Sequence, residues 1–94
     1  MNVRHIKESG GGYFLAENES GEMGRMTYTN AGSEKFIIDH TEVAPEYEGQ
    51  GVGKAMVHAA VDYARENGLK IVPLCSFARA IFVRNTDIHD VLYK

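Results

Sequence analysis

The chain has 94 residues, a net charge of −3 and 44% apolar residues. This length predicts one domain over residues 1–94, and the composition is that of a folded globular protein rather than a disordered one. The negative charge argues against a nucleic-acid partner, and no apolar run approaches membrane-spanning length. A single cysteine excludes an internal disulfide, the four histidines are too scattered to indicate a metal site, and the N-terminus lacks the apolar segment of a secretory signal, so we expect a cytoplasmic protein.

Four short strands are predicted in the first half of the chain. Alternating, β-branched and aromatic residues mark them at 3–7, 13–17, 22–29 and 35–43. The run Gly10-Gly11-Gly12 breaks the first two apart, and turn sequences rich in Asn, Gly and Ser separate the others. Gly24 in the third strand indicates a bulge. Such short turns between successive strands favour an antiparallel meander.

A helix follows the fourth strand, from about Gly51 to Asn67. Its apolar residues fall on one continuous stripe, formed by Val52, Met56, Ala59, Ala60 and Tyr63. Asn67-Gly68 is a typical C-terminal stop. The next strand, Leu69 to Leu74, is expected to lie parallel to the fourth strand because it follows a strand and a helix.

The last part of the chain predicts a second helix, Phe77 to Arg84. Ser76 precedes it as the expected N-cap. Asp87 is expected to cap a final short turn that extends through Leu92. Pro45 and Pro73 are expected to interrupt the pairing of the two parallel strands, so that these strands splay apart.

A glycine-rich junction lies between the fourth strand and the first helix, with Gly49, Gly51 and Gly53 at alternate positions. A strand that ends in such a turn and opens a helix aims several unpaired backbone N–H groups at one point, which suits a phosphate. The sequence does not fit a Walker loop, because Ala55 follows Lys54 and Glu48 occupies the first glycine position. The spacing of a dinucleotide fingerprint is also absent. A plain strand–helix turn, with glycines for close packing, stays an alternative.

The segment Glu48-Gly49-Gln50-Gly51-Val52-Gly53 resembles the pyrophosphate loop of the GCN5-related N-acetyltransferases, Arg/Gln-x-x-Gly-x-Gly/Ala, with Glu48 in place of the usual Arg or Gln. Together with the segments 40–46 and 72–77, it resembles the small single-domain, YjdJ-like branch of that family. The resemblance implies an α+β, minimal form of the family fold. Its parts are an antiparallel meander of four strands, a helix, a parallel fifth strand and a C-terminal helix.

The same resemblance implies that the chain uses acetyl-CoA and acetylates an amine of a small molecule or peptide. The pantetheine arm would pair with the backbone of Glu42 and Val43, and Cys75 and Ser76 would lie beside the coenzyme. The pyrophosphate would bind the backbone N–H groups of Gln50, Gly51, Val52, Gly53 and Lys54.

Three side chains are candidates for catalysis. Glu42 or His40, on one face of the fourth strand, is the expected base. Cys75, just before a helix, is a candidate nucleophile, proton donor or partner in a mixed disulfide with the coenzyme, and its alternative role is that of a small buried residue. A non-catalytic CoA or acyl-CoA binding module and, less strongly, a structural dimer module are the competing functions. The expected assembly is a monomer or a weak homodimer.

Overall fold

A five-stranded sheet in the order β1-β2-β3-β4-β5 forms the framework of the computed structural model, which describes residues 1–94. The strands are β1 Asn2–Glu8, β2 Gly11–Asn18, β3 Gly21–Ala31, β4 Lys35–Val43 and β5 Lys70–Pro73. The first four are antiparallel neighbours, and β5 pairs parallel with β4. The predicted α+β class, meander and parallel fifth strand are therefore confirmed.

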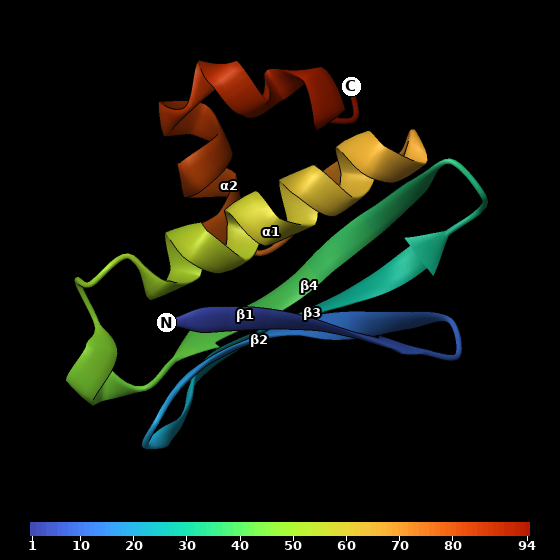
Figure 1. Ribbon diagram of the computed structural model, residues 1–94. Helices are drawn as coiled ribbons and strands as arrows, with labels where there is room; N and C mark the ends of the chain where they lie inside the picture. The colour runs from blue at the N-terminus through green and yellow to red at the C-terminus, as the bar shows by residue number, and fades with distance from the viewer.

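The helices α1 Val52–Asn67 and α2 Ser76–Arg84 and the 3₁₀ segment η2 Thr86–Val91 lie on one side of the β1–β4 sheet in Figure 1. The 3₁₀ turn η1 Pro45–Tyr47 lies beside the end of the sheet, between β4 and α1. Gly68 ends α1 in the left-handed conformation and donates its N–H to the carbonyl of Ala64, as its sequence predicts. No helix in the structure is long and apolar enough to cross a lipid bilayer.

Both predicted caps in the C-terminal part are wrong. Ser76 is already the first residue of α2, and the N-cap is Cys75, whose Sγ accepts a hydrogen bond from the N–H of Ala78. Asn85 precedes η2, and no side chain, including that of Asp87, caps this segment. The α2 cap is therefore made by sulfur, which is a weak acceptor compared with the hydroxyl expected from the sequence.

The core is one cluster of 19 buried residues, contributed by the sheet and by α1, α2 and η2. α1 lies across the sheet and buries the predicted stripe at Val52, Met56 and Ala60. The buried face of α1 is broader than predicted, because Val57, Val61 and Ala64 are buried as well as the stripe. α1 contacts α2 and η2 in addition to the sheet. The largest fully buried side chains of the core are Phe14, Phe36, Phe82, Met26, Ile38, Met56, Ile71 and Ile88.

The glycine run at 10–12 is only partly the predicted break. Gly10 lies in the turn, with φ at +79°, but β2 begins at Gly11. A Cβ at Gly11 would lie 2.2 Å from the carbonyl oxygen of Tyr28 in β3. Glycine is needed there because two strand backbones approach closely, not because the chain turns.

Bulges interrupt β3 and β4. In β3 the register passes from Glu17↔Glu22 to Ala16↔Gly24, so a bulge lies beside Gly24, as predicted. In β4 the register passes from Tyr28↔Ile38 to Thr27↔His40, so Asp39 is an extra residue. An extra residue reverses the alternation of side chains in the strand after it.

The reversal decides which β4 side chains face the helices. Before the bulge, Phe36 and Ile38 are buried beneath α1. After it, Thr41 pairs with the buried Met26 and so faces the helices too. His40 and Glu42 share the opposite face and are exposed.

An aromatic cluster surrounds His5 at the β1 edge of the sheet. The imidazole stacks on the ring of Phe14, with 4.3 Å between the ring centroids, and makes an edge contact with the ring of Tyr63, with 4.4 Å between the centroids. Its Nε2 lies 2.6 Å from the hydroxyl oxygen of Tyr28. Burial, together with the nearby charge of Lys7, lowers the pKa of His5. Burial, together with Tyr63, raises the pKa of Tyr28. Both shifts favour the neutral forms, so Tyr28 donates its hydroxyl hydrogen to a neutral His5.

We expect the thermal stability of the protein to fall as the pH drops from about 7.5 to about 5.5, in part through His5. The pKa of His5 in the folded protein is below its unfolded value of 6.5. The contribution of His5 to the free energy of unfolding is therefore fully present above pH 6.5, and it is lost as the pH falls below this value, because the unfolded chain binds a proton that the folded protein does not. The melting temperature of His5→Gln should depend less on pH over this interval. The control is His40→Gln, at an exposed histidine of the same sheet, and an equal pH dependence in wild type and His5→Gln would contradict the expectation.

Candidate functional site

The strands β4 and β5 part halfway along β4. Their pairing runs from Lys35↔Lys70 to Ile38↔Pro73 and stops there. The N–H groups of Leu74 and Cys75 both donate to the carbonyl of Ile38, as the chain leaves the sheet toward α2. The edge of β4 facing away from β3 therefore has no strand partner after Ile38. The expected splay is present, and it begins at Pro73 and the β4 bulge, well before Pro45.

The glycine loop presents a row of free donors beside this opening. The six backbone N–H groups from Gly49 to Lys54 make no hydrogen bond within the protein. Gly49 and Gly51 have φ of +77° and +80°, and a Cβ at either would meet nothing within 4 Å. The left-handed conformation turns successive N–H groups toward one side, at the positive end of the α1 dipole. The loop therefore fits an anion that approaches the backbone directly.

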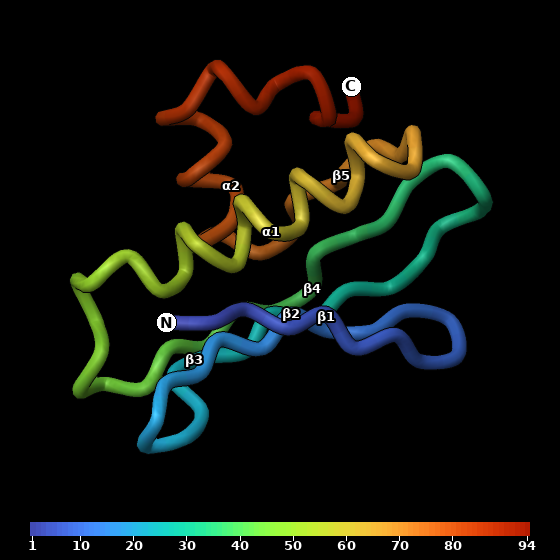
Figure 2. Tube along the Cα trace, in the orientation of Figure 1, coloured from blue at the N-terminus to red at the C-terminus, as the bar shows by residue number.

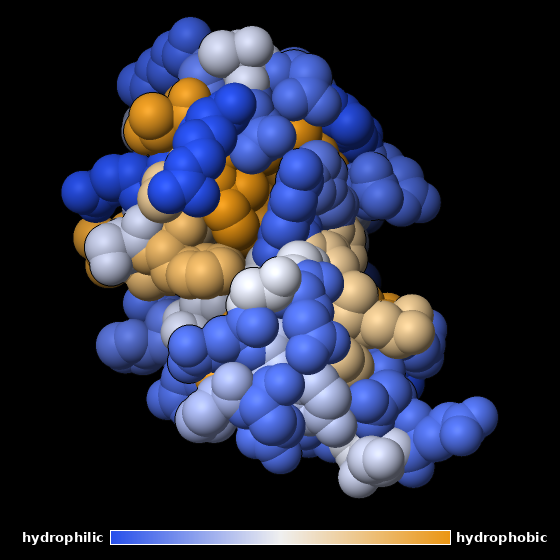
Figure 3. Space-filling model, turned by 90° about the vertical axis from the view of Figure 1, so that its left-hand side faces the viewer, coloured by the Kyte–Doolittle hydropathy of each residue, from blue (hydrophilic) through white to orange (hydrophobic).

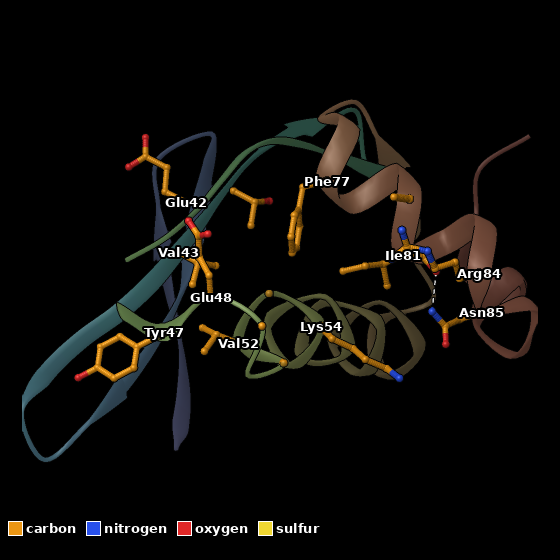
Figure 4. A pocket seen from close by; sticks show the side chains of 15 residues that line it. Glu42, Val43, Tyr47, Glu48, Val52, Lys54, Phe77, Ile81, Arg84 and Asn85 are labelled. Atoms are coloured by element: carbon orange, nitrogen blue, oxygen red, sulfur yellow. Dashed lines mark hydrogen bonds between the residues drawn. The ribbon is translucent and has the colours of Figure 1, made fainter. Parts of the chain in front are cut away.

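A cleft of about 1070 Å³ extends from the loop, along the end of β4, to α2. Figure 3 faces this end of the molecule and shows apolar surface at the bottom of a hollow with polar edges. Figure 4 shows the cleft bounded by the end of β4, the start of α1 and the inner face of α2. Its lining residues are Thr41, Glu42, Val43, Tyr47, Glu48, Gly49, Gly51, Val52, Gly53, Lys54, Phe77, Ala80, Ile81, Arg84 and Asn85.

Gly53 has a role different from that of the other two loop glycines. A Cβ on Gly53 would lie 2.1 Å from the ring carbons of Phe77, the second residue of α2. The ring of Phe77 points into the cleft between β4 and α1 (Figure 4). Gly53 thus allows the aromatic ring to lie against the α1 backbone, and the direct approach of an anion is left to Gly49 and Gly51.

Cys75 lies next to Thr41 where β4 and β5 separate. Thr41 Oγ1 and Cys75 Sγ are 3.3 Å apart, and the same sulfur accepts from the N–H of Ala78 at 3.4 Å. Cys75 is half-buried and is not among the cleft-lining residues. The side chain of β4 that reaches the cysteine is therefore Thr41, because the bulge at Asp39 turns it inward.

The structure brings together part of the predicted site. Of the predicted residues, the cleft is lined by Glu42, Val43, Gly51, Val52, Gly53 and Lys54. His40, Gln50, Cys75 and Ser76 do not line it. The Gln50 side chain instead donates to the carbonyl of Glu46. Sequence reasoning assigned no role in the site to Thr41, Tyr47, Ile81 or Asn85. The β4 bulge turns Thr41 to the cleft, the η1 turn contributes Tyr47, and the docking of α2 on α1 brings Ile81 and Asn85.

The charges along the cleft are separated by sign. Glu42 and Glu48 lie toward the β4 end, whereas Lys54 and Arg84 lie toward the end of α2 (Figure 4). No three histidine, cysteine, aspartate or glutamate side chains are close enough together to hold a metal ion. The arrangement offers backbone donors in the middle and cations at one end, and acidic residues border the other end.

Sequence comparisons match this chain to one protein family. Residues 12–91 match the family described as GCN5-related N-acetyl-transferase. Streptothricin acetyltransferase A of Bacillus subtilis (strain 168) is 33% identical over 67 residues, which are 71% of this chain and 39% of that protein. Streptothricin acetyltransferase of Streptomyces lavendulae is 32% identical over 57 residues, 58% of this chain and 30% of that protein. The chain thus spans roughly a third of the length of these two curated relatives.

Solved structures agree with the sequence comparisons. A GCN5-like protein from Staphylococcus aureus, determined by NMR, is 35% identical with a TM-score of 0.72, over 98% of this chain and 89% of that one. Nourseothricin acetyltransferase is 31% identical with a TM-score of 0.57, over 66% of this chain and 38% of that one. The similarity to the first structure thus extends over nearly the whole of this chain.

Proposed function

Because this chain belongs to the family of GCN5-related N-acetyltransferases, we propose that it transfers the acetyl group of acetyl-CoA to an amine of a small molecule or peptide. The small, YjdJ-like branch is the position in the family that we propose, on the strength of the element Pro73-Leu74-Cys75. We also place the activity in the cytoplasm, in a monomer or a weak homodimer.

The observation that carries this proposal is the row of free N–H groups from Gly49 to Lys54 beside the unpaired edge of β4. A pyrophosphate needs several donors aimed at one point, and this loop supplies them without displacing any hydrogen bond of the protein. The β4 backbone at Glu42 and Val43 would bind the amide groups of the pantetheine arm. Bound acetyl-CoA supplies an activated acyl group as a thioester.

We assign the proton transfers to residues at the β4 end. Glu42 lies at the edge of the cleft, with its side chain on the face of β4 away from the helices, and is our candidate base, acting directly or through water on an amine that approaches from that side. His40 shares its face of β4 and is the second candidate. We assign to Cys75, held between Thr41 and the start of α2, the donation of a proton to the leaving thiolate.

A non-catalytic module that binds CoA or acyl-CoA is the alternative. The observation that favours it is the composition of the cleft, whose lining includes neither a histidine nor a cysteine. Binding needs only the loop donors and the β4 edge, whereas acetyl transfer also needs a group that accepts a proton from the amine. The two functions share one site and differ in turnover alone.

Turnover and binding can be measured on the same protein. We expect acetyl-CoA to raise the melting temperature, and we expect a thiol reagent to detect free CoA when suitable members of an amine panel are added. Glu42→Gln should lower kcat by about 100-fold, the loss typical of a general base, while the thermal shift by acetyl-CoA persists. Cys75→Ala should lower kcat less, because the leaving thiolate is a weak base.

The matched control for Glu42→Gln is Glu46→Gln, at an exposed residue of η1 that does not line the cleft. Its kcat should equal that of the wild type. A thermal shift without thiol release for any amine would favour the binding module over the enzyme. No thermal shift at millimolar acetyl-CoA would contradict both functions.

A further inference from the structure

Two cationic side chains in the cleft have no partner within the protein. Of the ten lysine and arginine side chains, only those of Lys54, Arg84 and Lys94 make no hydrogen bond, ion pair or cation–π contact. Lys94 is the last residue of the chain, and the other two both line the cleft. The protein therefore leaves two cationic side chains without a partner in this cleft.

These two cations come from opposite walls. Lys54 is the third residue of α1, and Arg84 is the last residue of α2. Both lie at the end of the cleft that is remote from Glu42 and Glu48 (Figure 4). An anion bound at this end of the cleft would be attracted by both side chains.

We infer that Lys54 and Arg84 bind the 3′-phosphate of CoA, so that the cleft selects the 3′-phosphorylated coenzyme over dephospho-CoA. This inference rests on the proposed function. CoA carries two separate anionic groups, a pyrophosphate and a terminal phosphomonoester. The loop N–H groups suit the pyrophosphate, and the two side chains are a second, chemically distinct anion site along the same cleft. A guanidinium and an ammonium together match the double charge of a phosphomonoester.

Binding of the two coenzymes by calorimetry tests this inference. Wild-type protein should bind CoA about tenfold more tightly than dephospho-CoA at low salt, as expected of charge-assisted hydrogen bonds at an exposed site. Arg84→Gln should reduce this ratio to about three, and Arg84→Gln combined with Lys54→Gln should bring it close to one. The affinity of Arg84→Gln for dephospho-CoA should change less than about twofold. The preference should also weaken with added salt.

The control is Arg79→Gln, on the same helix as Arg84. Arg79 is exposed, donates only to the carbonyl of Leu74 and does not line the cleft, so its removal should leave the ratio unchanged. Arg84→Lys should retain most of the preference. Equal affinities of the wild type for both coenzymes, or a preference that survives the double substitution, would overturn this inference and leave the proposed function standing. A wild type that binds neither coenzyme would overturn the proposed function as well.

Discussion

Gly51→Glu is expected to abolish the stabilisation of this protein by acetyl-CoA. The substitution places a carboxylate among the free N–H groups of the loop, where it occupies the donors and repels the pyrophosphate. In the wild type, acetyl-CoA at 100 times its dissociation constant should add about 2.7 kcal/mol of stability, and thereby raise the melting temperature by about 10 °C or more. Differential scanning fluorimetry with and without ligand should show no rise for Gly51→Glu.

The chain offers a closely matched control in Gly32→Glu. Gly32 has a φ of +74° against +80° for Gly51, and a Cβ at either residue would meet nothing within 4 Å. Both substitutions therefore have the same backbone cost of about 1 kcal/mol, but Gly32 lies in the β3–β4 turn at the opposite end of the sheet (Figure 2). Gly32→Glu should melt at a lower temperature than the wild type and keep the full ligand-induced rise. A preserved rise in Gly51→Glu would mean that the loop does not bind the coenzyme.

Gly11→Ala is expected to destabilise the fold strongly, and far more than a methyl group added at the neighbouring turn residue Gly10. The new Cβ would lie 2.2 Å from the carbonyl oxygen of Tyr28, and both atoms belong to strand backbones that no change of rotamer can separate. Overpacking in a well-ordered structure typically costs 1–3 kcal/mol and occasionally more, and we expect about 3 kcal/mol here. The melting temperature should fall by more than about 10 °C.

Gly10→Ala is the comparison, one residue away in the turn. Its φ of +79° disfavours alanine by about 1 kcal/mol, but the Cβ would meet nothing within 4 Å. Urea unfolding should therefore show a much smaller loss of stability for Gly10→Ala than for Gly11→Ala. Equal losses would mean that β2 and β3 do not approach as closely at Gly11 as the structure has them.

Local patterns predicted most of the fold. The limits of β4 were given correctly by its β-branched residues and the flanking turn, and the end of α1 by Asn67-Gly68. The other strands were predicted in the right places and too short, apart from β5, which is shorter than predicted. The ends of a strand are set by its pairing with a neighbouring strand, and the residues of one segment alone do not determine this pairing.

The donors of the candidate site were predictable, but its walls were not. Loop glycines followed by an amphipathic helix are a local signal, so the position of the free N–H groups could be predicted from residues 49–54. The contribution of α2 depends on how that helix packs against α1, which brings residues more than 20 positions apart in sequence into one cleft. Phe77 and Arg84 acquired their positions in this way.

The sequence by itself determined the order of the elements, the glycine loop and the family, because each depends on residues that are neighbours along the chain. The tertiary structure alone decided which side chains meet at the junction of β4 and β5. The extra residue Asp39 reverses the alternation of β4, so that Thr41 faces Cys75 while His40 and Glu42 point away from the helices. A bulge of this kind arises from how two strands fit against each other and against a twisted sheet, and the alternation of one strand read alone cannot reveal it.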